Sequence, residues 1–140
     1  MPEEEKAEGE QMRKPARKTL RLKADKVFSE YIRKRDNYVC FTCGKRGQPS
    51  DGVMQCGHLF SRVNFSTRWD EENAFCQCRG CNMRHEFDFE VFRAAYVKAK
   101  GQEAYDDLYR RHREIKKFSD ADLLEVIYKY ELKLLDKTDI

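Results

Sequence analysis

Two Cys-x-x-Cys pairs, Cys40–Cys43 and Cys78–Cys81, carry the clearest chemical signal in the sequence. A zinc ion takes four ligands in a tetrahedron, with each sulfur about 2.3 Å from the metal. Each short spacing lets two thiolates reach one ion from a single tight turn, and Gly44 directly after the first pair suits such a turn. Together the two pairs predict a closed, structural zinc site with no open position for water.

The remaining cysteines, Cys56 and Cys76, leave alternatives for the ligand set. Cys76 with Cys78 offers another pair, and Cys56-Gly57-His58 could supply ligands of its own. We favour roles as small, buried apolar residues for Cys56 and Cys76, because the four cysteines of the two Cys-x-x-Cys pairs already complete the coordination shell of one zinc ion. An iron–sulfur cluster is less favoured, since no other feature of the sequence indicates redox chemistry.

Polar side chains that could act on a phosphodiester lie between and just after the cysteine pairs. They are His58, Asn73, Asn82 and His85. Hydrolysis needs a base that activates water and a cation that stabilises the leaving oxygen. A histidine with a pKa near ~6.5 can be the base, and amide and imidazole groups can help to hold Mg²⁺. If a helix begins near residue 80, Asn82 and His85 share one of its faces.

Arginines flank these candidates, two after His58 and two around the second cysteine pair. They are Arg62, Arg68, Arg79 and Arg84. Guanidinium groups bind phosphate oxygens in a bidentate manner, so we expect contacts to a DNA backbone. Any one of them could simply keep the surface soluble, but four around one centre favour a phosphate role. No pattern predicts base-specific reading, so recognition of DNA shape fits better.

The elements that must position these residues can be predicted from the spacing of apolar side chains. An amphipathic helix is expected over residues 23–36, where they recur at helical spacing. Residues 40–82 are rich in glycine, which indicates tight turns and short strands. We expect strands near 53–60 and 73–77.

The C-terminal third is predicted to be helical. One helix should end near Gly101, and Ser119 with Asp122 resembles a capping box that begins the last helix. That last helix carries an apolar stripe at steps of four and three residues, which indicates core packing, with a dimer seam as the alternative. The stripe consists of Leu123, Ile127, Tyr130 and Leu134.

Charge is unevenly placed along the chain. The net charge is only +3, but residues 11–35 contain ten lysines and arginines against two acids. This concentration indicates either a polyanion partner or a solvated helix face. We expect residues 1–22 to form a basic, flexible arm, because no apolar periodicity precedes residue 20. No apolar run approaches the ~20 residues of a membrane span and no signal segment opens the chain, so we expect a cytosolic protein.

The order of the motifs resembles the zinc-containing HNH nucleases. It runs Cys-x-x-Cys-Gly, Gly-His, Asn and Cys-x-x-Cys-Asn, and it is most similar to the phage recombination nuclease family called NinG or Rap. The likeness covers roughly residues 27–105, from the end of the first predicted helix through Gly57-His58 and Asn73 to the helical tail. Phage endonuclease VII, which resolves branched DNA, is similar in its zinc pairs and in the Asn after the last Cys.

The resemblance implies a role for each candidate. His58 would be the general base, and Asn73 would be the middle Asn, which orients the loop that carries the base. Asn82 would contact the catalytic Mg²⁺ or Mn²⁺. His85 stands near the family's last acidic or His position and would be a further ligand.

The sequence departs from the family pattern next to the base. Many HNH enzymes place a metal-binding Asp or His immediately before the base, where this chain has Gly57. NinG-like chains carry Asp three residues before the His, where this chain has Gln55. A neutral amide binds Mg²⁺ less strongly than a carboxylate does, so the second protein ligand is either Gln55 or a nearby acid. The acids considered are Asp70, Glu86 and Asp88.

The resemblance also implies an α+β fold with a small zinc-stapled ββα-metal core, treble-clef-like, and flanking helices. The nuclease domain would span residues 23–100, followed by a helical extension over 101–140.

The implied function is metal-dependent hydrolysis of DNA, selective for branched DNA such as Holliday junctions in phage-type recombination, in the cytoplasm of the bacterial host. Alternatives are a general HNH nicking nuclease, a non-catalytic zinc module that binds nucleic acid, or a zinc-stapled protein-interaction domain. Cutting both strands of a junction needs two active sites, which favours a homodimer.

Overall fold

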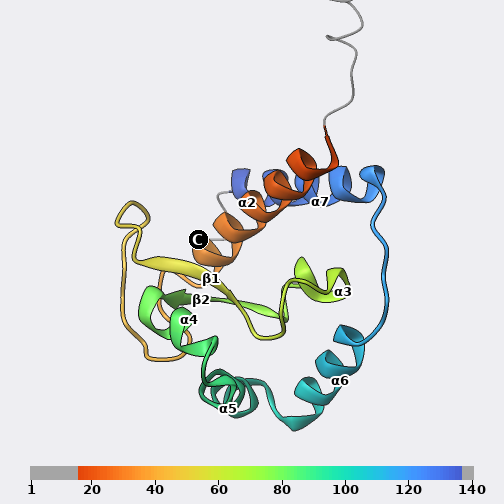
Figure 1. Cartoon of the computed structure of the whole chain (residues 1–140). Helices are drawn as coiled ribbons and strands as arrows, with labels where there is room; N and C mark the ends of the chain where they lie inside the picture. The colour runs from red at the N-terminus through yellow and green to blue at the C-terminus, as the bar shows by residue number, and fades with distance from the viewer. Residues whose placement is uncertain (1–15, 137–140) are drawn as a thin grey trace, which may run out of the picture.

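The computed structural model describes residues 16–136, and a two-stranded antiparallel sheet lies at its centre (Figure 1). Strand β1 spans Met54–His58 and strand β2 spans Ala74–Cys78, with Cys56 directly opposite Cys76. Both strands lie where the sequence predicted them. Every residue of β2 is buried, whereas β1 keeps partly exposed residues along its length. No third strand of the described chain pairs with β1, so its outer edge is free to face a cleft.

Helices α2 (Arg17–Arg35) and α7 (Asp120–Leu135) pack against each other above the sheet and enclose the larger core. Ser119 and Asp122 form the predicted capping box at the start of α7. The stripe on α7 faces α2, which confirms the prediction of core packing. Its buried members are Leu123, Ile127 and Tyr130.

Helix α2 begins at Arg17, well before the start that the sequence predicted. The Arg17 guanidinium donates to the Phe118 carbonyl oxygen at 2.6 Å and pairs with Asp120 at 3.3 Å. These contacts with the start of α7 could not be foreseen from local periodicity. The helix therefore includes residues 17–22, which were expected to belong to a flexible arm. Residues 1–15 of that expected arm lie outside the described residues.

A second core lies on the other face of the sheet. Helices α4 (Arg79–His85), α5 (Phe89–Lys100) and α6 (Gln102–His112) follow one another there (Figure 1). The core is largely aromatic, and Phe75 of β2 contacts Phe92 of α5 edge to face, with ring centroids 6.0 Å apart. The sheet thus separates an aliphatic and aromatic core under α2 from an aromatic core beside α5.

The C-terminal third completes both cores and is not a separate extension. Helix α6 contributes the buried Leu108 to the second core, and α7 packs against α2 in the first. The boundary that the sequence suggested at residue 100 lies between α5 and α6, which pack against each other. Gly101, with φ 95°, makes the predicted break between α5 and α6. Nowhere in residues 16–136 is a helix both long enough and apolar enough to cross a bilayer.

Candidate functional site

The cysteines of the two Cys-x-x-Cys pairs converge on one point. Their Sγ atoms all lie within 4.8 Å of one another, and Cys43 Sγ is 3.8 Å from Cys78 Sγ. A tetrahedral ion with Zn–S bonds of about 2.3 Å holds its sulfurs about 3.8 Å apart. The cluster therefore fits a structural zinc ion, and the residues that could hold it are those that the sequence predicted. They are Cys40, Cys43, Cys78 and Cys81.

Two different turns present these sulfurs. After Cys40, the Gly44 amide donates to the Cys40 carbonyl oxygen at 2.9 Å, and Gly44 has φ 77°, a conformation that favours glycine. Cys78 ends β2 and caps α4, where its sulfur accepts from the Cys81 amide at 3.4 Å. A zinc ion at this point would tie the loop after α2 to the junction of β2 and α4.

Cys56 and Cys76 lie opposite each other on the two strands, outside the cysteine cluster. Burial raises the pKa of each thiol to about 12, so both thiols are protonated at neutral pH. Neither sulfur belongs to the group of four that converges, and those four already complete a tetrahedral zinc shell. Their environment supports the interpretation as small apolar residues of the sheet.

A cleft of about 720 Å³ lies along β1 and is lined by residues of α2, β1, the loop after β1, and the α4–α5 region. The functional candidates that line it are Gln55, His58, Arg62, Asn82 and His85. These residues are far apart in the sequence, and the fold brings them together because α4 turns back beside β1. The candidate base and the candidate cation ligands therefore share one space.

His58 ends β1 with its ring orientation fixed by the backbone. Its Nε2 lies 2.8 Å from the Arg68 carbonyl oxygen. Because a carbonyl oxygen only accepts, Nε2 carries the hydrogen and Nδ1 keeps the free lone pair. Burial lowers the pKa of His58 to about 4, despite the opposing hydrogen bond to Arg68. The ring is therefore neutral at pH 7 and can accept a proton from water.

A side-chain hydrogen bond links Asn82 of α4 to Gln55 of β1 in the lining of the cleft. Asn82 Nδ2 donates to Gln55 Oε1 at 2.9 Å, so Oδ1 of Asn82 is not used by this bond. The bond uses one of the two lone pairs of the Gln55 oxygen, the atom that would have to bind a cation. In this arrangement Gln55 orients Asn82, and the Asn82 oxygen is the better candidate ligand.

His85 lies on α4 and lines the same cleft as Asn82, as the predicted helix spacing required. Its Nε2 lies 2.8 Å from the Leu59 carbonyl oxygen, so this nitrogen is the donor. The other ring nitrogen, Nδ1, is buried and has no hydrogen-bond partner among residues 16–136. A buried lone pair without a partner is unfavourable, and a cation or a water molecule would satisfy it.

Gly57 stands immediately before His58 because a larger residue does not fit. A Cβ atom at this position would lie 1.9 Å from Gln77 Oε1. Gln77 is fully buried on β2, and its amide donates to Thr42 Oγ1 at 2.7 Å. The space that a metal-binding side chain before the base would need is thus filled from the neighbouring strand.

Asn73 is fully buried and is not part of the cleft lining. Its Oδ1 accepts from the Phe60 amide at 2.9 Å, and its Nδ2 donates to the carbonyl oxygens of Phe60 and Thr67 at 3.0 Å each. These bonds fix the loop that leaves β1 directly after His58. The geometry fits a positioning role without contact to a metal ion.

The arginines predicted to contact phosphate fall in different places. Arg62 lines the cleft, whereas Arg79 and Arg84 are exposed outside its lining. Arg68 departs from the prediction, because its side chain is only 11% exposed and pairs with Asp25 at 2.5 Å. A guanidinium buried and paired in this way holds α3 (Phe65–Arg68) to α2 and is not available to a phosphate.

Sequence reasoning missed two cleft residues on α2, Ser29 and Arg33. Arg33 Nε donates to the Ser29 carbonyl oxygen at 3.3 Å. Arg33 belongs to the basic segment 11–35, which is the signal that could have found it. The face of α2 that reaches the cleft became known only when the helix was placed beside β1. Arg33 and Arg62 together make the cleft suitable for a phosphate group.

Of the acids considered as cation ligands, only Glu86 lines the cleft. Asp70 is paired with Arg111 of α6, and Asp88 caps α5 and pairs with Arg84 at 3.6 Å. Glu86 is therefore the carboxylate best placed to join the candidate ligands of α4.

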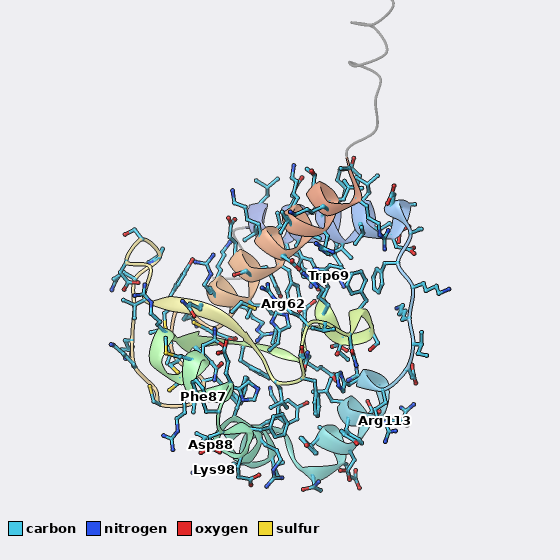
Figure 2. All side chains as sticks on the ribbon, in the orientation of Figure 1. Arg62, Trp69, Phe87, Asp88, Lys98 and Arg113 are labelled. Atoms are coloured by element: carbon cyan, nitrogen blue, oxygen red, sulfur yellow. The ribbon has the colours of Figure 1, made fainter. Side chains whose placement is uncertain are left out.

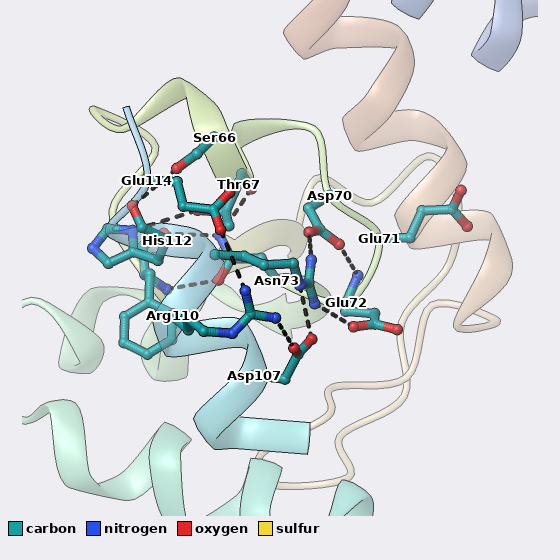
Figure 3. Close-up of polar contacts among 12 residues, drawn as sticks. Ser66, Thr67, Asp70, Glu71, Glu72, Asn73, Asp107, Arg110, His112 and Glu114 are labelled. Carbon is teal, nitrogen blue, oxygen red and sulfur yellow. Dashed lines mark hydrogen bonds and ion pairs between the residues drawn. The ribbon is translucent and has the colours of Figure 1, made fainter. Parts of the chain in front are cut away.

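An ion-pair network attaches α6 to the loop that carries Asn73 (Figure 3). Arg111 pairs with Asp70, with Glu72 at 2.5 Å and with Asp107 of its own helix at 2.9 Å. The network thus joins α6 to the loop whose Asn73 bonds to the segment after His58.

The sequence is similar to phage proteins along almost its whole length. It matches the family model described as "NinG: Bacteriophage Lambda NinG protein" over residues 2–138. Curated relatives called Protein ninG, from Escherichia phage 933W and Enterobacteria phage VT2-Sa, are each 26% identical to it over 115 residues. These matches cover 81% of this chain but 55% of each relative, so the chain spans about half the length of the curated relatives it matches. No solved structure gives a significant match.

Proposed function

The chain belongs to the NinG family, and from this premise we propose that it is a metal-dependent endonuclease that hydrolyses phosphodiester bonds in DNA. The observation that carries the proposal is the composition of the cleft. His58, Asn82 and His85 line it together with Arg33 and Arg62. A neutral imidazole, a candidate cation site and two guanidinium groups in one space are what phosphodiester hydrolysis requires.

The order of the elements supports an HNH assignment with a ββα-metal core. Strands β1 and β2 are antiparallel, and α4 follows β2 directly. The candidate base ends β1, and the candidate cation ligands lie on α4 and just after it. The cysteine cluster joins the loop before β1 to the start of α4, as a treble-clef-like zinc site would.

His58 is proposed as the general base. The bond from Nε2 to the Arg68 carbonyl oxygen holds the ring, so that Nδ1 takes the proton of the attacking water. A pKa near 4 makes the free ring a weak base, but it is already neutral at pH 7. A bound phosphate beside the ring would raise this pKa, because negative charge stabilises the imidazolium form. Substrate binding would thus bring the base closer to its working range.

Asn82 Oδ1, His85 Nδ1 and Glu86 are the groups that would hold Mg²⁺ or Mn²⁺. The buried, unpartnered Nδ1 of His85 is the observation that supports this fit within the described residues. When bound, the ion would stabilise negative charge on the phosphate and on the leaving oxygen. Gln55 keeps the Asn82 amide in place through its 2.9 Å hydrogen bond.

The proposed substrate is branched DNA, such as a Holliday junction in phage recombination. Arg33 and Arg62 would bind the phosphate backbone, and such contacts position DNA without reading its sequence. A junction has two strands to cut, and each needs its own cleavage centre. We therefore extend the proposal to a homodimer that acts in the host bacterium.

A cleavage assay on a panel of DNA substrates tests this function. Zinc-loaded protein is incubated with Mg²⁺ or Mn²⁺ and end-labelled duplex, single-stranded or four-way-junction DNA. We expect cuts confined to the junction. Nicking of all duplexes would indicate a general HNH nuclease. Binding without cutting would indicate a non-catalytic zinc module, an alternative that Gln55 favours because NinG-like chains carry Asp there.

A further inference from the structure

An exposed aromatic side chain stands at the rim of the cleft. Phe87 is 84% exposed in the turn between α4 and α5, where Figure 2 shows it. Glu86 before it and Phe89 two residues after it both line the cleft, so Phe87 belongs to the turn that borders the cleft. Phe87 belongs to none of the apolar clusters of residues 16–136. A phenyl ring is normally buried, so packing does not explain its presence here.

We propose that Phe87 stacks on an unpaired nucleobase of the DNA whose phosphate occupies the cleft. This inference rests on the proposed function and names the feature of the substrate that the cleft selects. An aromatic ring can stack on any base, because every base has a π face. In a duplex the bases are already stacked on both sides. A base that has left the helix, at a branch point or in a single strand, can take the ring without the cost of unstacking a base step, so it is the favoured partner.

The surroundings of Phe87 favour a nucleic acid over a protein partner. Arg84, one turn earlier on α4, has a side chain that is 63% exposed, and Arg33 and Arg62 lie inside the cleft. A DNA strand can meet the ring with a base and the cations with its phosphates. Phe87 is flanked in sequence by Glu86 and Asp88, which would repel phosphate, but Asp88 is paired with Arg84 at 3.6 Å and Glu86 would hold the catalytic cation. A stable protein interface needs about 800 Å² on each partner, whereas these charged residues border the ring on both sides in sequence.

Fluorescence of an unpaired 2-aminopurine tests the inference directly, because stacking on an aromatic ring quenches this base analogue. The probe is a forked DNA with 2-aminopurine in the single strand next to the branch, and a fully paired duplex with the same base is the reference. Ca²⁺ replaces the catalytic ion so that the DNA is not cut. Affinity and quenching are measured for the wild type, Phe87→Ala, Phe87→Trp and Ile115→Ala.

We expect the wild type and Phe87→Trp to quench the forked probe and to prefer it to the duplex. Phe87→Ala should lose the quenching and about tenfold of that preference. Ile115 is 94% exposed in the loop after α6, so Ile115→Ala is a control for loss of exposed apolar surface and should behave as the wild type. Because Phe87 is exposed, Phe87→Ala should keep the circular dichroism spectrum of the wild type.

Two further outcomes separate this inference from the function on which it rests. If Phe87→Ala quenches and prefers the fork as the wild type does, the stacking inference is wrong, and cutting by that variant would leave the nuclease function intact. If the wild-type protein neither binds nor cuts any of the DNA substrates, the proposed function is wrong and the stacking inference with it.

Discussion

At the scale of single residues, the cleft depends on side chains that are each held by one specific neighbour. The Arg68 carbonyl oxygen fixes the His58 ring, and Gln55 fixes the Asn82 amide. Asn73 holds the loop between these two parts of the cleft. These bonds do not use Nδ1 of His58 or Oδ1 of Asn82, and both residues line the cleft.

The His58 ring should titrate with a midpoint near pH 4, well below the ordinary value near ~6.5. Between these two values the unfolded chain binds a proton that the folded protein does not bind. The free energy of unfolding should therefore fall as the pH is lowered from about 6.5 toward 4. An NMR titration of the ring protons in zinc-loaded protein measures the midpoint. A midpoint near 6.5 would show that the ring is solvated and not buried.

Gly57→Ala should destabilise the protein through its contact with Gln77. The new Cβ would meet Gln77 Oε1, which is fully buried and cannot move into solvent. We expect a loss of about 1–3 kcal/mol in urea unfolding. The double variant Gly57→Ala/Gln77→Ala should be no less stable than Gln77→Ala alone, because the clash is gone. If the two losses simply add, the two side chains do not compete for the same space.

At the scale of elements, the sequence predicted those parts of the fold whose signals are local. The cysteine spacings, the two strands and the capping box of α7 each lie within a few consecutive residues. The start of α2 was not predictable, because it depends on Arg17 meeting Phe118. The role of α6 was not predictable either, since Arg111 meets Asp70 only in the folded chain.

Arg111→Ala should loosen the attachment of α6 to the loop that carries Asn73. The change removes the partner of Asp70, whose side chain is 19% exposed, and we expect a loss of about 1–2 kcal/mol of stability. Arg110→Ala is the matched control, because Arg110 is 65% exposed and, among residues 16–136, pairs only within α6 and just after it. The Arg110→Ala variant should lose less than about 0.5 kcal/mol of stability. Equal losses in urea unfolding would mean that the network does not support the loop.

At the scale of the whole molecule, one sheet and one cysteine cluster connect two cores.

The candidate site was largely predictable, since Gln55, His58, Asn82 and His85 all line one cleft. The pairing of Arg68 with Asp25 is invisible in the sequence, so the prediction of a phosphate contact could not take it into account. The sequence also does not indicate which face of α2 borders the cleft, because that depends on how the helix packs beside β1. Residue types and spacing therefore indicated the chemistry, while the fold decided which charges remain free for a ligand.

Cys40→Ser should unfold or aggregate the protein, because a zinc ion held by the cysteine cluster would supply folding energy to a chain of this size. Circular dichroism and zinc content per chain measure the effect. Cys56→Ala is the control, and it should keep full zinc content because Cys56 lies outside the cluster. A stable, fully zinc-loaded Cys40→Ser variant would mean that other residues, such as Cys56 or Cys76, complete the ligand set.

The cleavage rate of His58→Ala on a four-way junction tests the central claim most directly. The rate constant is measured with enzyme in excess, alongside zinc content and thermal unfolding, for the variant and the wild type. We predict a loss of at least about 100-fold in cleavage, with zinc content and folding unchanged, because the group that accepts the water proton is gone. A variant that cuts the junction as fast as the wild type would contradict the assignment of this cleft as the hydrolytic centre.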